Sequence, residues 1–193
     1  AKDAQDTVSP IDHTGVLRDP SVYEGGLFTD VDVRVHGYWN FLAGSFGYTY
    51  GNNAIWQMWK PGLPYAIPCN MDWRSAMDRP GSNDLRHMRY IFEKRPFYKL
   101  IPDQSVIFGP NPGNEKHLRA AVADDGSFIM VYHSVGQPAL VRLDGLGDLI
   151  FGWWFDTREG TVKEIGSIEN TGIREFTPPT SGKGNDWLLV LDD

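Results

Sequence analysis

Cysteine is almost absent from this 193-residue chain, since Cys69 is the only one. An internal disulfide is therefore excluded, and no histidine or lysine stands next to Cys69 to activate a thiolate. Clusters of basic residues are also missing: the chain has 18 Lys and Arg against 25 Asp and Glu, a formal net charge of −7. Phosphate backbones are bound by gathered Lys and Arg, so this composition argues against a nucleic-acid partner.

Long apolar runs and the common cofactor patterns are missing as well. No stretch approaches the ~20 apolar residues that a membrane-spanning helix needs, so we expect no membrane partner. The five histidines are scattered without the spacing of a zinc site. The segment SGKGND lacks the spacing of a phosphate-binding loop, and no serine stands in a G-x-S-x-G elbow. The sequence therefore predicts no metal and no cofactor.

Aromatic residues are plentiful by contrast, at 13% of the chain with seven Trp. Such side chains fill cores or stack on the C–H faces of sugar rings. Residues 47–59, GYTYGNNAIWQMW, concentrate them without a single charge. This stretch combines rings that could stack on a sugar with amides that could hydrogen-bond its hydroxyls.

The first hundred residues predict mixed helix and strand. Residues 14–17 favour a short strand, and a helix capped by Thr29 follows, ending at Gly47. Its apolar stripe has helical spacing: Val31, Val35, Tyr38, Trp39, Leu42 and Phe46. Residues 48–50 then favour a second strand, which completes a βαβ unit. A further helix is expected from a cap at Ser82 or Asn83 until Arg95-Pro96, with one apolar side: Leu85, Met88, Ile91 and Phe92.

From about residue 104 the pattern predicts strands only. Hairpin turns are indicated at Asp124-Asp125-Gly126 and at Arg158-Glu159-Gly160. The expected strands are HLRAAVA, SFIMVYH, ALVRL, LIFGWWFD, TVKEIGSI, REFT and DWLLVLD. Seven short strands with regular turns are typical of a β-sandwich. We therefore expect an α/β region at 1–100 and an all-β domain at 101–193.

Glu24 is the carboxylate whose position suggests chemistry. It lies between a predicted parallel strand and the capped helix, and such loops form the active face of barrel enzymes. The alternative is an ordinary acidic residue of a surface loop. Residues at the end of the next strand and just after it would crowd the same mouth and contact a sugar: Tyr50, Asn52, Asn53, Trp56, Gln57 and Trp59. The alternative for Trp56 and Trp59 is that they only pack this loop onto the barrel.

Several motifs, in order, resemble one family. GYTYGNNAIWQMW, preceded by YEG and FTDVDVRVHGYWNFLAG, is similar to the apiosidase-like glycoside hydrolases. IPDQS, WWFDTREG, GIREFTPP and GNDWLLVLDD resemble the collagen-binding β-domain that ends those proteins. The resemblance implies a fold class of α/β plus all-β: the last βα units of a (β/α)8 TIM barrel, then a C-terminal β-sandwich.

The resemblance also implies roles for residues. Glu24 matches the glutamate after the family's seventh strand, its nucleophile, and Tyr23 agrees with the adjacent tyrosine, beside the substrate. The family favours D-G-E-P-x-Y-E here, whereas this chain reads R-D-P-S-V-Y-E, so only Tyr23 and Glu24 agree. Asn52 stands where relatives often carry histidine. The expected activity is hydrolysis of glycosidic bonds in plant or host polysaccharide by a retaining, two-carboxylate mechanism, in an extracellular or periplasmic protein.

A complete (β/α)8 barrel takes ~200 residues or more, twice what precedes the β-domain here. The acid/base carboxylate of the family comes from an earlier strand, and retaining chemistry needs both groups ~5 Å apart. We therefore expect a missing N-terminal barrel portion, as a second chain or fragment, or a homo-oligomer. The chain is not expected to be active alone.

Two other interpretations stay open. One is a non-catalytic carbohydrate-binding or matrix-binding protein. Trp153 and Trp154 are adjacent in a strand and must point to opposite faces, so one is free to cover a neighbouring domain or to form an open ring platform. The other is a degenerate pseudo-enzyme, which the altered residues before Glu24 favour.

Overall fold

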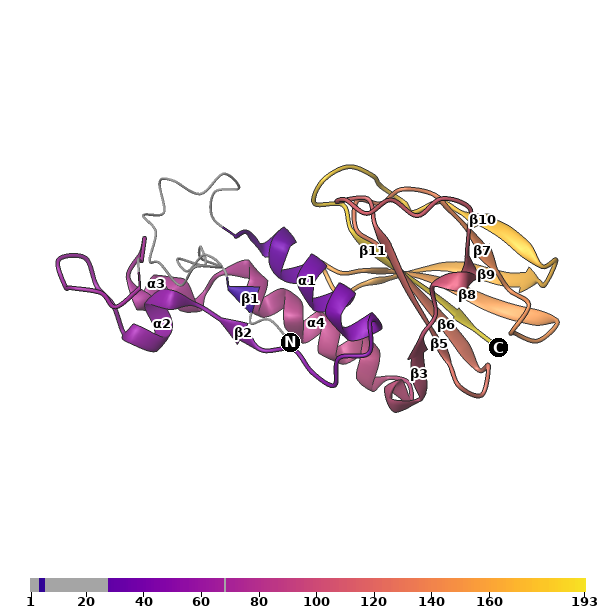
Figure 1. Ribbon diagram of the computed structural model, residues 1–193, viewed down its shortest axis with the longest axis horizontal. Coiled ribbons are helices and arrows are strands. Elements are labelled where there is room, and N and C mark those ends of the chain that lie inside the picture. The colour runs from indigo at the N-terminus through magenta and orange to yellow at the C-terminus, as the bar shows by residue number, and fades with distance from the viewer. Residues whose placement is uncertain (1–3, 6–27, 68) are drawn as a thin grey trace.

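The structure is a computed structural model that describes residues 4–5, 28–67 and 69–193. The molecule is elongated, with helices at one end and strands at the other (Figure 1). Among the described residues, no helix combines the length and the hydrophobicity needed to cross a membrane.

Among its described residues, the helical region holds two long helices and two short ones. They are α1 (Asp30–Leu42), α2 (Asn53–Gln57), α3 (Trp73–Met77) and α4 (Pro80–Glu93). The two-residue strands β1 (Ala4–Gln5) and β2 (Tyr50–Gly51) pair in parallel, and α1 lies between them in the sequence. A helix between parallel strands was predicted. The strand expected at residues 14–17 lies outside the described residues.

Helix α1 begins where predicted and ends earlier. The Asp32 carboxylate accepts hydrogen bonds from the backbone N–H (2.7 Å) and the hydroxyl (2.9 Å) of Thr29, which caps the helix. The helix ends at Leu42 because Gly44 adopts φ +89°, which helical geometry forbids. The expectation that the helix and its apolar stripe extend to Phe46 is therefore wrong. Phe46 lies beyond the helix and is fully exposed.

Helix α4 begins earlier than the sequence suggested. Arg79 is its N-cap and Pro80 occupies the first turn, where a missing N–H costs nothing. Ser82, expected as a cap, instead donates its hydroxyl to the carbonyl of Arg79 (2.9 Å). The predicted apolar side is confirmed, since Met88, Ile91 and Phe92 are buried and Leu85 packs beside them.

All seven predicted strands are present, within one or two residues of the expected bounds. They are β5 (Leu118–Ala123), β6 (Phe128–His133), β7 (Ala139–Arg142), β8 (Leu149–Asp156), β9 (Val162–Glu169), β10 (Ile173–Phe176) and β11 (Trp187–Asp192). The sequence did not predict the short strands β3 (Leu100–Pro102) and β4 (Ile107–Phe108), nor the 3-10 turns η2 (Phe97–Lys99) and η3 (Gln104–Val106).

These strands form two antiparallel sheets. The larger has the order β3-β5-β6-β11-β8-β9 and the smaller β10-β7-β4. The hairpins β5–β6 and β8–β9 turn where predicted, at Gly126 (φ +74°) and Gly160 (φ +67°). Glycine adopts this left-handed backbone conformation without strain. The described fold is therefore mostly β, with few helices.

Two hydrophobic clusters lie on the two faces of the larger sheet. One contains Leu189 of that sheet and Val141 of the smaller sheet, so both sheets share it. The other joins the opposite face to α1 and α4. Trp154 belongs to the first cluster and Trp153 packs against the second, so the two rings point to opposite faces, as predicted. Trp153 thus covers the helical region rather than forming an open platform.

Candidate functional site

Glu24, the predicted nucleophile, and Tyr23, predicted to lie beside the substrate, are both outside the described residues. The described part of the expected site is the stretch 50–59, which begins at β2 and runs through α2. It contains the six other residues predicted to contact a sugar.

Asn52 and Asn53 are buried directly after β2. The Asn52 side-chain oxygen accepts a hydrogen bond from the backbone N–H of Ala54 (3.0 Å) and so caps α2. Its amide nitrogen, Nδ2, is buried and has no hydrogen-bond partner among the described residues. A buried amide without an acceptor costs free energy, so this N–H is available to a hydroxyl that reaches it.

The side-chain amide of Gln57 forms hydrogen bonds with the backbone of its own loop. Its Oε1 accepts from the backbone N–H groups of Ala66 (2.7 Å) and Ile67 (3.2 Å), and its Nε2 donates to the carbonyls of Asn53 and Ile67 (both 2.9 Å). Nε2 also lies 3.2 Å from Cys69 Sγ. Gln57 therefore fixes the segment 66–69. Burial raises the pKa of the Cys69 thiol, so this cysteine is not an activated nucleophile.

The three aromatic residues of the stretch have different surroundings. Trp56 exposes 56% of its surface, an unusual fraction for so large an apolar ring. Trp59 is half-buried and donates its indole N–H to the carbonyl of Leu63 (2.9 Å), which closes the following turn. Tyr50 is half-buried in β2. Trp56 is thus the ring that a sugar could reach most easily.

A buried ionic network, which the sequence did not predict, joins the helices to the larger sheet. Arg34 of α1 is 2% exposed and pairs with Asp30 (2.8 Å), Asp84 of α4 and Asp186 just before β11 (2.9 Å). Asp186 also accepts the Tyr132 hydroxyl (2.9 Å). One guanidinium therefore holds together three segments that are far apart in the sequence.

The charges of this network do not balance. Burial raises the pKa of the Asp84 carboxyl, and the hydrogen bond from Arg34 offsets only part of that effect. Burial lowers the pKa of Arg34, but the bonds and charge of Asp186 outweigh it, so the pKa stays above its ordinary value. Arg34, Asp84 and Asp186 are all buried, so their ion pairs lie inside the junction between the helices and the larger sheet. No group of His, Cys, Asp and Glu within the described residues is arranged to hold a metal ion.

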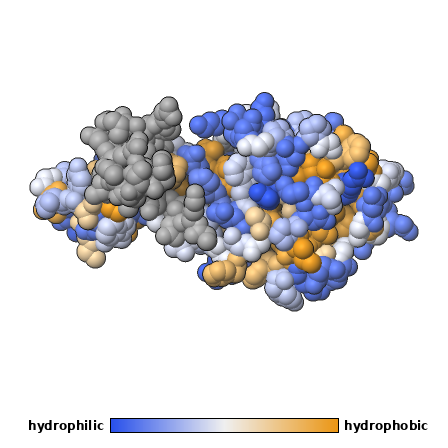
Figure 2. Space-filling model, in the orientation of Figure 1, coloured by the Kyte–Doolittle hydropathy of each residue, from blue (hydrophilic) through white to orange (hydrophobic). Residues whose placement is uncertain are grey.

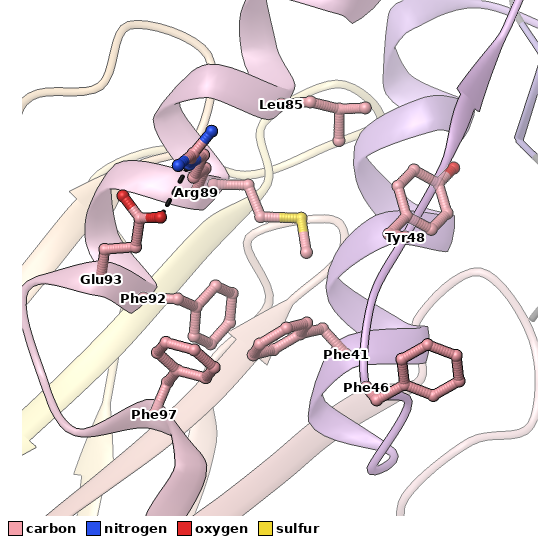
Figure 3. A pocket seen from close by; sticks show the side chains of 9 residues that line it. Phe41, Phe46, Tyr48, Leu85, Arg89, Phe92, Glu93 and Phe97 are labelled. Carbon is pink, nitrogen blue, oxygen red and sulfur yellow. Dashed lines mark hydrogen bonds and ion pairs between the residues drawn. The ribbon is translucent and has the colours of Figure 1, made fainter.

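A groove of about 300 Å³ opens between the end of α1 and α4. Figure 3 shows Phe41, Phe92 and Phe97 converging in it, while the ion pair of Arg89 and Glu93 (2.7 Å) lies at its edge. The remaining walls are apolar too: Phe46, Tyr48, Leu85 and Met88. Figure 2 shows further hydrophobic surface gathered over the strand-rich end.

The fold is similar to that of solved glycoside hydrolases. A solved structure described as a glycoside hydrolase shares 34% sequence identity and a TM-score of 0.81, over 86% of this chain and 37% of that one. The crystal structure of a glycoside hydrolase family 5 protein from Bacteroides vulgatus ATCC 8482 has 27% identity and a TM-score of 0.85, over 98% of this chain and 39% of that one.

The family matches are more specific. Residues 14–99 match the apiosidase-like catalytic domain, and residues 101–192 match the family described as the putative collagen-binding domain of a collagenase. The resemblance to the apiosidase-like glycoside hydrolases with their C-terminal β-domain is therefore confirmed. No curated protein sequence matches the chain. The chain spans less than two fifths of the length of either solved structure, at 37% and 39%.

Proposed function

We propose that this chain is the C-terminal portion of a glycoside hydrolase that cleaves glycosidic bonds in plant or host polysaccharide, outside the cytoplasm, in an extracellular or periplasmic location. One observation carries the proposal: residues 14–99 match an apiosidase-like catalytic domain within a fold that two glycoside hydrolases share over most of this chain. The two solved structures that share this fold are described as glycoside hydrolases, so a sugar is the expected substrate.

In this proposal residues 1–100 form the last βα units of a (β/α)8 barrel, and residues 101–193 form a β-sandwich docked against it. The parallel pair β1–β2 with α1 between its strands supports the first part. Two antiparallel sheets with a shared cluster between them support the second.

Glu24 is the proposed nucleophile. It attacks the anomeric carbon, while a second carboxylate protonates the leaving oxygen and then activates the water that releases the sugar. Glu24 precedes α1 and Asn52 follows β2, positions that belong to one active face in a barrel. The unpartnered Asn52 amide and the exposed Trp56 ring would then bind a sugar hydroxyl and a sugar face.

The acid/base carboxylate comes from the rest of the barrel, supplied by another segment, a second chain or a second copy. The groove of Figure 3 supports this step, because an apolar groove of about 300 Å³ beside the fully exposed Phe46 ring is a surface that a neighbouring barrel element would cover.

Glu24→Gln in the completed barrel tests the proposal. Loss of the nucleophile should reduce hydrolysis of polysaccharide on the order of a thousandfold or more, with binding retained. Glu169→Gln, an exposed change of the same kind on β9, should leave the rate unchanged. Hydrolysis that survives Glu24→Gln undiminished would refute the mechanism.

The second candidate is a non-catalytic carbohydrate-binding or matrix-binding protein. The observation that favours it is the exposed Trp56 ring on the short helix that the buried Asn52 caps, a pair able to bind sugar without Glu24. Sugar binding that is abolished by Trp56→Ala, in a protein where Glu24→Gln changes nothing, would establish this second function.

A further inference from the structure

We propose a second sugar-binding site, distinct from the stretch 50–59, in a cleft between α1 and two loops of the strand-rich region. The cleft has a volume of about 400 Å³, within the range of small-ligand sites. The charged and aromatic side chains that line it are those of Asp32, His36, Trp39, Glu115, Lys116 and Lys183. The proposal rests on the proposed function, since it takes the ligand to be a unit of the same polysaccharide.

One wall is the face of α1 that carries His36 and Trp39, three residues apart and therefore neighbours on the helix. Trp39 is half-buried, and its indole N–H donates to the carbonyl of His117 (3.1 Å). Its ring meets the His117 ring edge-on at 5.6 Å. The aromatic wall is therefore held in place before any ligand arrives.

The first loop of the opposite wall is the turn 114–117. The Ser134 hydroxyl, just after β6, donates to the carbonyls of Glu115 and His117. The Gln137 amide donates to the carbonyl of Lys116. These bonds tie the backbone of the turn to the sheet and leave the side chains of Glu115 and Lys116 exposed at the cleft.

The second loop is the segment 180–186, which contains the sequence SGKGND. The Gly182 N–H donates to the carbonyl of Val135 (2.8 Å), and Gly182 and Gly184 have φ of +103° and +81°. A Cβ on Gly184 would lie 3.5 Å from Val31 of α1, so the loop runs close to the helix. A motif that lacks the spacing of a phosphate-binding loop therefore serves to bring Lys183 to this cleft.

The charges of the cleft favour an uncharged sugar. Lys116 and Lys183 line the cleft together with Glu115 and Asp32, so its formal charges cancel, and the Asp32 carboxylate also accepts the hydrogen bonds of the Thr29 cap. Neither lysine has an ion-pair partner in the part of the chain that the structure describes. Sugar hydroxyls both donate and accept, which suits ammonium and carboxylate groups together, and aromatic surface suits the sugar ring. An anion would meet the two carboxylates.

The position of the cleft connects it to the substrate. Asp32 is in the first turn of α1, which begins six residues after Glu24. In the proposed barrel the N-terminal end of such a helix lies toward the active face, so a polysaccharide bound there would have a second contact surface, made jointly by the helical and strand-rich regions. The β-domain then takes part in substrate binding rather than only supporting the barrel.

The test is titration calorimetry of the native protein with cellohexaose, xylohexaose and hexagalacturonate. Lys116→Ala/Lys183→Ala should weaken binding of a neutral hexasaccharide by about 10- to 100-fold, because each lysine donates charged hydrogen bonds. Lys94→Ala/Lys163→Ala removes the same charge from exposed positions outside the cleft and should leave affinity unchanged.

Each other outcome overturns the site. Neutral hexasaccharides that bind the double variant as tightly as the native protein, or bind neither, contradict it, and so does binding of hexagalacturonate alone. The proposed function fails separately: if Glu24→Gln leaves hydrolysis intact while the lysine variant loses sugar affinity, the cleft stands without the mechanism. If Glu24→Gln abolishes hydrolysis and the lysine variant binds normally, the mechanism stands without the cleft.

Discussion

The strand-rich and helical regions bury their apolar side chains in different ways. Every buried member of the cluster between the two sheets comes from the strand-rich region, from Val106 to Leu191. The helical region has no such cluster among its described residues: Tyr38, Leu42 and Phe92 are buried only together with residues of the larger sheet, such as Met130. Its other side exposes large rings, including Phe46 and Trp56.

This difference indicates which part can hold its fold alone. A region with a closed core of its own gains burial independently of its neighbours. A region whose helices are covered on one face depends on the sheet that covers that face, and in our proposal also on a partner at its other face. The two regions meet through the second cluster and through Arg34, so the junction is where the comparison can be tested.

Removing Arg34 should have the largest effect. Arg34→Ala leaves Asp84 and Asp186 buried without their common partner, and breaking a buried pair costs roughly 3–5 kcal/mol. We expect the helical region to separate first, seen as loss of helical circular dichroism at a lower denaturant concentration than loss of the sheet. The measurement is equilibrium urea unfolding followed at both signals.

The control is Arg89→Ala, which breaks the exposed pair with Glu93 and should cost no more than about 0.5 kcal/mol. If both variants unfold in one transition, and with equal loss of stability, the network is not what joins the regions.

His133 should make the strand-rich region sensitive to acid, with the next largest effect. Burial lowers the pKa of His133 from 6.5 to about 4. The unfolded chain takes up the proton below pH 6.5 and the folded chain only near pH 4. Stability from this group is therefore present above pH 6.5 and lost as the pH falls to 4, by about 3 kcal/mol.

His133→Asn removes this titration and keeps a donor to the carbonyl of Gln137, which the ring nitrogen Nδ1 contacts at 2.7 Å. Thermal unfolding of both proteins from pH 7 to pH 4 should show a shallower loss for the variant. If the unfolding temperatures of the two proteins fall equally with pH, protonation of His133 in the folded protein costs little free energy.

Sequence pattern predicted the strand-rich region better than the helical one, and the reason is physical. Strands such as β6 and β11 are apolar runs bounded by turn residues, so their ends are marked locally. The helix start at Pro80 was missed because a Pro-Gly pair also signals a loop. Helix α2 was missed because five residues are too few to show a period.

The roles of the polar side chains at the junction and in the candidate site were harder to predict, because these roles depend on partners that the local pattern does not show. An arginine at helical spacing is usually a solvated residue, and only the fold brings Asp186 to Arg34 from 152 positions away. Gln57 was expected to contact a sugar, yet its amide is engaged by the backbone of its own loop. The cap at Thr29, by contrast, depends on residues three positions apart and was predictable.

The smallest effect on stability is expected at Phe46. Its ring is fully exposed and lies on the rim of the apolar groove, so Phe46→Ser should change the free energy of unfolding by no more than about 0.5 kcal/mol. The same change should weaken association with the partner that we propose for this groove, because it removes apolar area from it. Light scattering across a concentration series measures the second effect, and urea unfolding measures the first.

Tyr98→Ser is the matched control, because this ring is also exposed (78%) but does not line the groove. A loss of association in Phe46→Ser alone would assign the uncovered side of the helical region to a partner. If the two variants lose association equally, the exposure of an aromatic ring governs association and its position at the groove does not. A loss of more than about 1 kcal/mol in Phe46→Ser would mean that this side is already packed within the chain, since surface changes away from contacts cost less.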